Sequence, residues 1–170
     1  MASRMLTAQL KRQEGFVSVP RPCPAGHVTI GHGHRLTAWP WSEHEAEYLE
    51  LPSDWDIRPM TRAEAETVLL QDIFLAENDA RALVHGFDSI DEARRDVLVN
   101  LTFNMGRAGV LKFGHMLGAF DRGDWDEAAW QLQTRGGKGT ANSEWYDEVG
   151  LRGPELVAQL RTGKWLETTP

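Results

Sequence analysis

A carboxylic acid, a thiol and a hydroxyl group follow one another near the start of the chain, at Glu14, Cys23 and Thr29. Eight residues separate the first pair and five separate the second. Hydrolysis of a glycosidic bond needs a general acid that protonates the leaving oxygen and a second group that activates water or attacks carbon. Glu14 could supply the acid and a thiolate at Cys23 the second group, while the Thr29 hydroxyl could hold a water molecule.

Cys23 is the only cysteine in the chain, which excludes an internal disulfide and fits a protein made in a reducing cytoplasm. A thiol is mostly protonated at neutral pH, and Arg21 and His27 are close enough in sequence to favour the thiolate. The alternative role for Cys23 is that of a small buried packing residue. A proline on each side makes that role less attractive, because it leaves the cysteine in a stiff, extended loop that suits the positioning of a side chain.

The composition limits the partners that the chain can bind. The chain has 170 residues, a formal net charge of −7 and 41% hydrophobic residues. The acidic balance argues against nucleic acid as a partner, because phosphate binding needs a basic surface. The hydrophobic share suffices for a core without a metal or disulfide. We expect a monomer with no metal and no cofactor.

The sequence also limits where the protein works. No stretch approaches the roughly 20 apolar residues of a membrane-spanning helix, so we expect no membrane insertion. The first 15 residues contain no apolar run of signal-peptide length. We therefore expect the protein to accumulate in the cytoplasm in which it is made.

The first third of the chain changes character twice. Apolar spacing predicts a short helix over residues 5–13, which Gly15 ends. Alternation of valines with small or polar residues predicts a β-hairpin or small sheet over 16–36, with a turn near 24–26. We interpret the acidic, aromatic stretch 38–60 as an insertion packed on this sheet.

Two capping boxes predict where long helices begin. In such a box a hydroxyl and a glutamate three residues later each bind the other's backbone amide. The two boxes are Thr61 with Glu64 and Ser89 with Glu92. The first opens a helix over 61–84, and the second opens a helix that is apolar on nearly all sides, and therefore buried, until Gly106 stops it.

Shorter helices are expected in the last third of the chain, at about 110–121, 124–134 and 154–161. Asp124 is a plausible N-cap for the second of these helices, with further acids in its first turn. A glycine-rich segment over 135–143 separates the last two. The order of elements predicts an α+β fold that is mostly α.

Four segments carry a resemblance to a known family. They are "EG…C…TIGHGH", "SIDEARRDVLVNLTFNMGRAGVLKF", "RGDWDEAAWQL" and "EWYDEVGLRGPELVAQLRTGKW". The first resembles the signature of the phage-type lysozymes, the endolysins of glycoside hydrolase family 24, which carry Glu, then Asp or Cys, then Thr at these spacings. The other three resemble later segments of T-even phage lysozymes. The resemblance covers most of the chain, except roughly 38–60 and 135–143.

The resemblance implies one catalytic domain over 1–170 with two lobes. It places a small β lobe at about 14–60, a connecting helix at about 61–84, and a helical lobe at about 85–170 together with the N-terminal helix. The activity that it implies is hydrolysis of the β-1,4 bond between N-acetylmuramic acid and N-acetylglucosamine in bacterial peptidoglycan.

The resemblance also assigns roles to eight residues. The catalytic residues would be Glu14 as general acid, Cys23 in place of the second carboxylate and Thr29 as the hydroxyl; Asn104, Arg152 and His32 would bind substrate; and His34 would form a structural pair with Asp72. Asn104 stands where T-even enzymes have a glutamine, so the amide is kept on a shorter side chain. Trp145 and Tyr146 match a "WY" pair in the family, and we interpret both as packing residues.

Several hypotheses about the function are consistent with the sequence. The leading one is a muramidase that lyses the host at the end of a phage cycle and reaches the wall through a holin pore. A lytic transglycosylase would use Glu14 alone, and Cys23 could then be replaced without loss. A third reading is a non-catalytic wall-binding or virion module. With Cys23 in the second catalytic position, either inversion or retention of the anomeric centre could follow.

Overall fold

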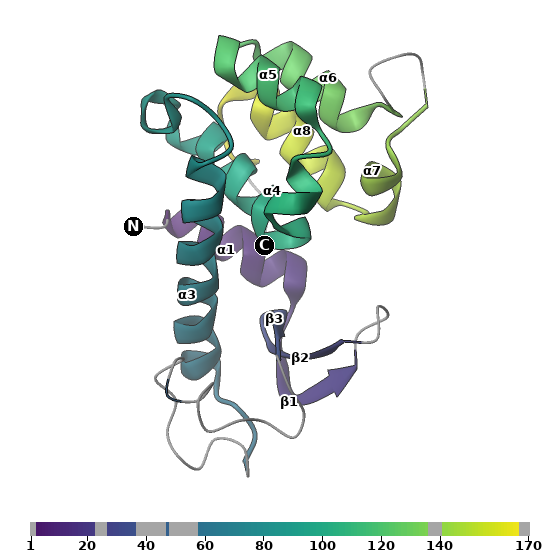
Figure 1. Ribbon diagram of the computed structural model, residues 1–170. Helices are drawn as coiled ribbons and strands as arrows, with labels where there is room; N and C mark the ends of the chain where they lie inside the picture. Colours follow the sequence, from purple (N-terminus) through teal and green to yellow (C-terminus); the bar gives the residue numbers. More distant parts are fainter. Residues whose placement is uncertain (1–2, 23–26, 37–46, 48–57, 136–140, 167–170) are drawn as a thin grey trace. The chain divides into compact units, whose positions relative to one another are not determined.

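The computed structural model describes residues 3–22, 27–36, 47, 58–135 and 141–166 (Figure 1). The chain divides into two compact units, which we call the first unit (Met1–Leu75) and the second unit (Ala76–Pro170). Most described residues are helical, and the first unit adds one three-stranded antiparallel sheet. The predicted α+β, mostly α class is therefore confirmed. None of the helices in the described ranges has the length and apolar character needed to cross a bilayer.

The first unit begins with helix α1 (Arg4–Glu14), which matches the predicted helix. The Ser3 hydroxyl caps its start by accepting a hydrogen bond from the Leu6 amide at 2.9 Å. Gly15 ends it with a φ of 70°, a conformation that favours glycine, and the Gly15 amide donates to the Lys11 carbonyl at 3.1 Å. Glu14 is therefore the last residue before the chain turns away from the helix.

The predicted hairpin is a small antiparallel sheet of three strands in the order β1-β2-β3. The strands are β1 (Val17–Pro22), β2 (Val28–Gly31) and β3 (His34–Arg35). Arg21 pairs with Thr29 across the first two strands, and Ile30 pairs with His34 across the last two. The turn predicted near 24–26 lies outside the described residues, as does nearly all of the insertion predicted at 38–60.

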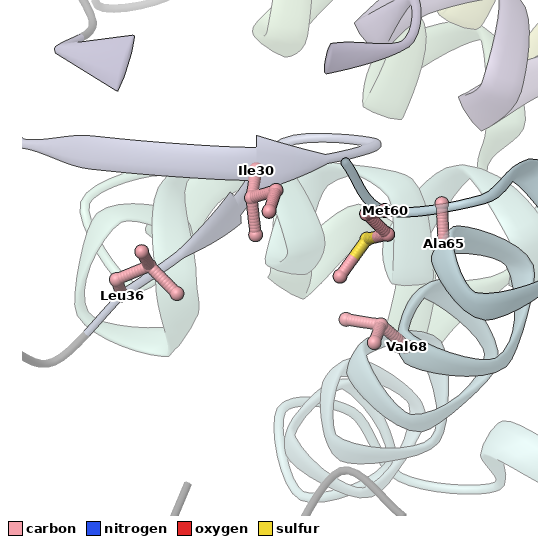
Figure 2. Packing of buried hydrophobic residues seen from close by; sticks show 5 residues of the cluster. All are labelled: Ile30, Leu36, Met60, Ala65 and Val68. Carbon is pink, nitrogen blue, oxygen red and sulfur yellow. The ribbon is translucent and has the colours of Figure 1, made fainter. Parts of the chain in front are cut away.

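The sheet packs on the first turns of α3 (Arg62–Arg81) through a small apolar core. The core residues are Ile30, Leu36, Met60, Ala65 and Val68, and Figure 2 shows their side chains gathering from β2, from the chain directly after β3, from the chain just before α3, and from α3 itself. Phe16 and Val28 extend the core. The capping box at the start of α3 is confirmed, because the Thr61 amide donates to Glu64 Oε2 at 2.8 Å and the Glu64 amide donates to Thr61 Oγ1 at 3.2 Å.

The second unit is a cluster of helices around an apolar core. Its helices are α4 (Glu92–Val110), α5 (Gly114–Arg122), α6 (Trp125–Gln133), α7 (Glu144–Glu148) and α8 (Arg152–Thr162). Helix α6 packs on both α5 and α8, and α4 also packs on α8. As predicted, α4 is buried along much of its length. The predicted stop at Gly106 is instead a kink, where φ is 69° and ψ is 166°, and the helix continues to Val110.

One of the two predicted capping boxes is wrong. Helix α4 is capped by Asp91, whose carboxylate accepts from the Arg94 amide at 3.1 Å, and not by Ser89. Ser89 instead closes a short 3-10 turn over Phe87–Ser89, with its amide bound to the Gly86 carbonyl at 2.8 Å. Asp91, two residues after Ser89, is also a residue type that caps helices. Because Ser89 belongs to the preceding 3-10 turn, Asp91 is the residue that caps α4. Helix α7 was not predicted, whereas the Asp124 cap of α6 is confirmed.

Candidate active site

The candidate acid lies where α1 meets the turn between β2 and β3. Glu14 is half-buried at the end of the helix. A Cβ atom added to Gly33 would stand 2.9 Å from Glu14 Oε2, so the carboxyl group rests directly against the backbone of the turn. Gly33 has a φ of 85°, which a side chain would also make unfavourable. The positive φ therefore favours glycine at this position, and a larger residue would displace the Glu14 carboxyl group.

The turn that contacts Glu14 is only two residues long, His32 and Gly33. Gly31 before it also has a positive φ, of 65°. The tight turn connects β2 to β3. Because Glu14 contacts this turn, its position depends on the sheet that carries Thr29. The sequence pattern showed this only as the glycine-rich run "GHGH", and the role of Gly33 against the carboxyl was not predicted.

Thr29 lies in the middle of β2 and is half-buried. Its backbone pairs with Arg21 on one side and Arg35 on the other, so both neighbouring strands fix its position. Cys23, the other predicted catalytic residue of this sheet, lies outside the described residues. The chain just before it is held by the pairing of Pro22 with Val28. The first unit thus brings Glu14 and Thr29 onto adjoining elements.

The structure brings His34 and Asp72 together, as the resemblance implied. His34 Nδ1 lies 3.0 Å and 2.9 Å from the two carboxylate oxygens of Asp72, and both side chains are largely buried. Because a carboxylate only accepts, Nδ1 carries the proton. The pair joins β3 to α3 and so anchors the far end of the turn that contacts Glu14.

His32 is buried, with 5% of its surface exposed, although turn residues are commonly exposed. Its Nδ1 is hydrogen-bonded to the Gly15 carbonyl. The ring packs against Phe16 with the ring centroids 5.7 Å apart. The substrate-binding role that the resemblance implied for His32 stays a prediction.

The two remaining predicted binding residues belong to the second unit. Arg152 is the first residue of α8 and is buried. Asn104 is exposed on α4, and its Oδ1 accepts a hydrogen bond from Trp145 Nε1 at 2.9 Å. Their roles toward substrate stay predictions.

Trp145 lines a pocket of about 470 Å³ within the second unit. The pocket is lined by Met105, Gly109, Lys112, Phe113, Gly114, His115, Met116, Gln131, Thr134, Arg135, Ser143, Glu144, Trp145 and Glu148. The Phe113 and Trp145 rings meet edge to face, with centroids 6.3 Å apart and planes at 81°. Sequence reasoning interpreted Trp145 as a packing residue, and the structure gives it a hydrogen bond and a pocket wall as well.

The pocket carries charges of both signs. Lys112, His115 and Arg135 contribute cationic or titratable groups, while Glu144 and Glu148 contribute carboxylates. Arg135 and Glu144 form an exposed ion pair at 3.1 Å. Over the described ranges, no group of three His, Cys, Asp or Glu side chains could hold a metal ion. The pocket lining therefore offers carboxyl, hydroxyl, amide and aromatic groups for binding.

Comparison with known proteins places these features in a family. The model of the family described as phage lysozyme matches residues 11–142. Two proteins of Dictyostelium discoideum named as probable T4-type lysozymes, 2 and 1, are 24% and 26% identical to the chain; the first match covers 93% of this chain and 94% of the relative, and the second 81% and 82%. The pre-baseplate central spike protein Gp5 of Enterobacteria phage T4 is 25% identical over 93% of this chain, which corresponds to 28% of the spike protein.

Proposed function

Because the chain belongs to the phage lysozyme family, we propose that it is a muramidase, which hydrolyses the β-1,4 bond between N-acetylmuramic acid and N-acetylglucosamine in peptidoglycan. Family membership supports the broader statement that the chain is a lysozyme-like peptidoglycan hydrolase. The observation that carries the finer proposal is the Glu14 carboxyl group, half-buried at a helix end and held against Gly33 beside the strand that carries Thr29.

In the proposed reaction Glu14 is the general acid. Its carboxyl group donates a proton to the glycosidic oxygen as the bond to the anomeric carbon breaks, and the bonding electrons stay on that oxygen. A water molecule supplies the new oxygen on the anomeric carbon. The Thr29 hydroxyl helps to hold this water.

Cys23 is proposed as the second group. If its thiolate takes the proton from the attacking water, the product forms in one step with inversion. If the sulfur attacks carbon, a thioglycosyl intermediate forms and water then releases the sugar with retention. The configuration of the first-formed product distinguishes the two routes.

We also propose a binding role for Asn104 and for the pocket beside it. The hydrogen bond from Trp145 fixes the Asn104 amide, and Trp145 and Phe113 give the pocket an apolar wall. Such a surface suits the apolar face of a sugar ring or a wall peptide, with Lys112 and Glu148 available for charged groups. Arg152 is proposed as a further substrate contact.

The proposed biological setting is lysis of a Gram-negative host. In this proposal the protein accumulates in the host cytoplasm as a monomer and reaches the wall through a holin pore. The similarity to a phage spike protein favours a second setting, in which the same wall-cleaving domain is carried on the virion. Expression in Gram-negative cells with and without a holin tests the first setting, which lysis in the absence of the holin would contradict.

The decisive experiment is digestion of purified Gram-negative peptidoglycan, followed by mass analysis of the fragments. The unmutated protein is compared with Glu14→Gln and with a matched control, Glu66→Gln. Glu66 is a half-exposed carboxylate of the same unit that pairs with Lys11 at 2.6 Å. We expect reducing muramic-acid ends from the unmutated protein and the control, and a loss of about 1,000-fold or more from Glu14→Gln.

Each other result points to a different reading. Anhydro-muramic ends, with full activity retained by Cys23→Ala, would identify a lytic transglycosylase. Absence of cleavage, with retained binding to the wall, would identify a wall-binding or virion module. Unchanged cleavage by Glu14→Gln would remove Glu14 from the role of acid.

A further inference from the structure

His32 occupies an unusual position for a residue of a two-residue turn. Its ring is turned inward and almost fully buried, and it reaches back to a segment 17 residues earlier in the chain. A carbonyl oxygen only accepts hydrogen bonds, so Nδ1 of His32 donates to the Gly15 carbonyl and the tautomer is fixed. The sequence-based role of a substrate contact does not explain this bond.

The carbonyl that His32 binds belongs to the residue directly after Glu14. Gly15 is held at both of its backbone groups, because its amide donates to Lys11 and its carbonyl accepts from His32. Neither of the two peptide groups that flank Gly15 can therefore rotate without breaking a hydrogen bond, and the one to His32 is partly buried. A fixed backbone at this point limits where the Glu14 side chain can lie.

Packing holds the His32 ring in the same place. Phe16 lies against the ring at 5.7 Å between centroids, with the planes at 50°. On α3, the Arg62 guanidinium stands 4.5 Å from the centre of the Phe16 ring. The contacts of Phe16 with Arg62 and with His32 thus join α3, the start of the sheet and the turn.

The second residue of the turn contacts the carboxyl group itself. Gly33 leaves room for Glu14 Oε2, which lies 2.9 Å from the position of an added Cβ. One turn residue therefore holds the backbone next to the acid and the other receives its side chain. We infer that His32 is a positioning residue for Glu14, acting through the Gly15 carbonyl; the inference rests on the proposed function, in which Glu14 is the acid.

Two substitutions separate the hydrogen bond from the packing. His32→Asn keeps a donor near the position of Nδ1 but loses the ring, and His32→Phe keeps a ring against Phe16 but has no donor. We expect His32→Phe to lower kcat on soluble peptidoglycan fragments by about 10- to 100-fold with KM changed less than about twofold, because misplacement of a catalytic group acts on the chemical step. His32→Asn should stay within about threefold of the unmutated kcat.

The opposite pattern would overturn the inference. Full activity of His32→Phe with loss in His32→Asn would show a packing role alone, and a raised KM at unchanged kcat would show a substrate contact. If His32→Phe fails to fold, His32→Leu replaces it as a smaller side chain without a donor. His85→Leu is the control, since His85 is an exposed histidine of the second unit whose Nδ1 has an oxygen partner of its own, the Asp121 carboxylate at 3.1 Å.

A second measurement does not depend on activity. The side-chain carboxyl carbon of Glu14 gives an NMR resonance whose position reports its surroundings. We expect the chemical shift of this carbon to change in His32→Phe and to stay the same in His32→Asn. If the unmutated protein does not cleave peptidoglycan, the proposed function fails, whereas an unmoved Glu14 resonance in His32→Phe would overturn the positioning role by itself.

Discussion

The two units of the chain hold their functional groups in different ways. In the first unit a hydrogen bond to the Gly15 carbonyl and the close approach of Gly33 place the candidate acid, and the core of the sheet has five buried apolar residues. In the second unit the pocket stands on a helical core whose fully buried members include Leu98, Leu101 and Met116. The position of the acid in the first unit therefore depends on a few individual atoms, whereas the pocket in the second unit depends on the packing of many side chains.

This difference predicts how substitutions act. In the first unit, a change that moves the acid by a fraction of an ångström should lower the rate and leave most of the stability in place. In the second unit, a change at the pocket wall should weaken binding and leave the chemical step unaltered. Two substitutions test this division and a third tests the cap of α3, and they follow in decreasing order of expected effect.

Gly33→Ala should have the largest effect. The new Cβ would stand 2.9 Å from Glu14 Oε2, so the carboxyl group must move, and we expect kcat to fall about 100-fold. The positive φ of 85° should also lower the free energy of unfolding by about 1–2 kcal/mol. Kinetics on peptidoglycan fragments and urea unfolding measure the two effects.

Gly150→Ala is the matched control for backbone strain. Its φ is 57°, and an added Cβ would meet none of the described atoms within 4 Å. Gly150→Ala should lower the free energy of unfolding about as much as Gly33→Ala does, and it should leave the activity unchanged. Equal losses of activity in the two variants would mean that strain, and not contact with Glu14, explains the result.

Trp145→Phe should have a moderate effect that is confined to binding. Phenylalanine keeps an aromatic ring near Phe113 but cannot donate to Asn104 Oδ1, so the amide is no longer fixed. Loss of one hydrogen bond of about 1 kcal/mol should raise KM about fivefold with kcat unchanged. Trp165→Phe is the control, because it loses a similar bond, to Asp96 at 3.1 Å, outside the pocket. A similar rise in KM for both variants would contradict a binding role for the pocket.

Glu64→Gln should have the smallest effect, on stability alone. Hydrogen bonds from Arg58, and then from Thr61, hold the pKa of Glu64 at about 2, below its ordinary value of 4.5. A carboxyl group with a lowered pKa stabilises the folded state fully above pH 4.5, and this contribution is lost as the pH falls toward 2. We expect Glu64→Gln to lower the free energy of unfolding by about 1 kcal/mol at pH 7.

The pH dependence tests the cause of that loss. The difference in unfolding free energy between Glu64→Gln and the unmutated protein should shrink between pH 4.5 and pH 2 as Glu64 takes up a proton in the latter. A difference that stays constant over this range would mean that the side-chain shape, and not its charge, caps α3. The activity at neutral pH should not change, because Glu64 caps the start of α3 and is none of the proposed catalytic or binding residues.

Short-range features of the fold were predictable. The end of α1 at Gly15, the Thr61–Glu64 box and the Asp124 cap each depend on residues within four positions of one another, so a local pattern contains the whole interaction. The start of α4 shows the limit of prediction from local sequence patterns. Ser89 and Asp91 both fit a cap, and the 3-10 turn that precedes them decided in favour of Asp91.

The site was predictable only in its residue types. The sequence by itself determined that Glu14 ends a helix, that Thr29 lies in a strand and that a glycine-rich turn follows, because backbone propensities are local. Tertiary structure decided that His32 reaches Gly15 and that Trp145 fixes Asn104, over separations of 17 and 41 residues. The pair of His34 and Asp72, 38 residues apart, was expected only from the family resemblance. No local pattern contains such contacts, because each one exists only after the packing of separate elements has brought the two side chains, or a side chain and a carbonyl, within hydrogen-bonding distance.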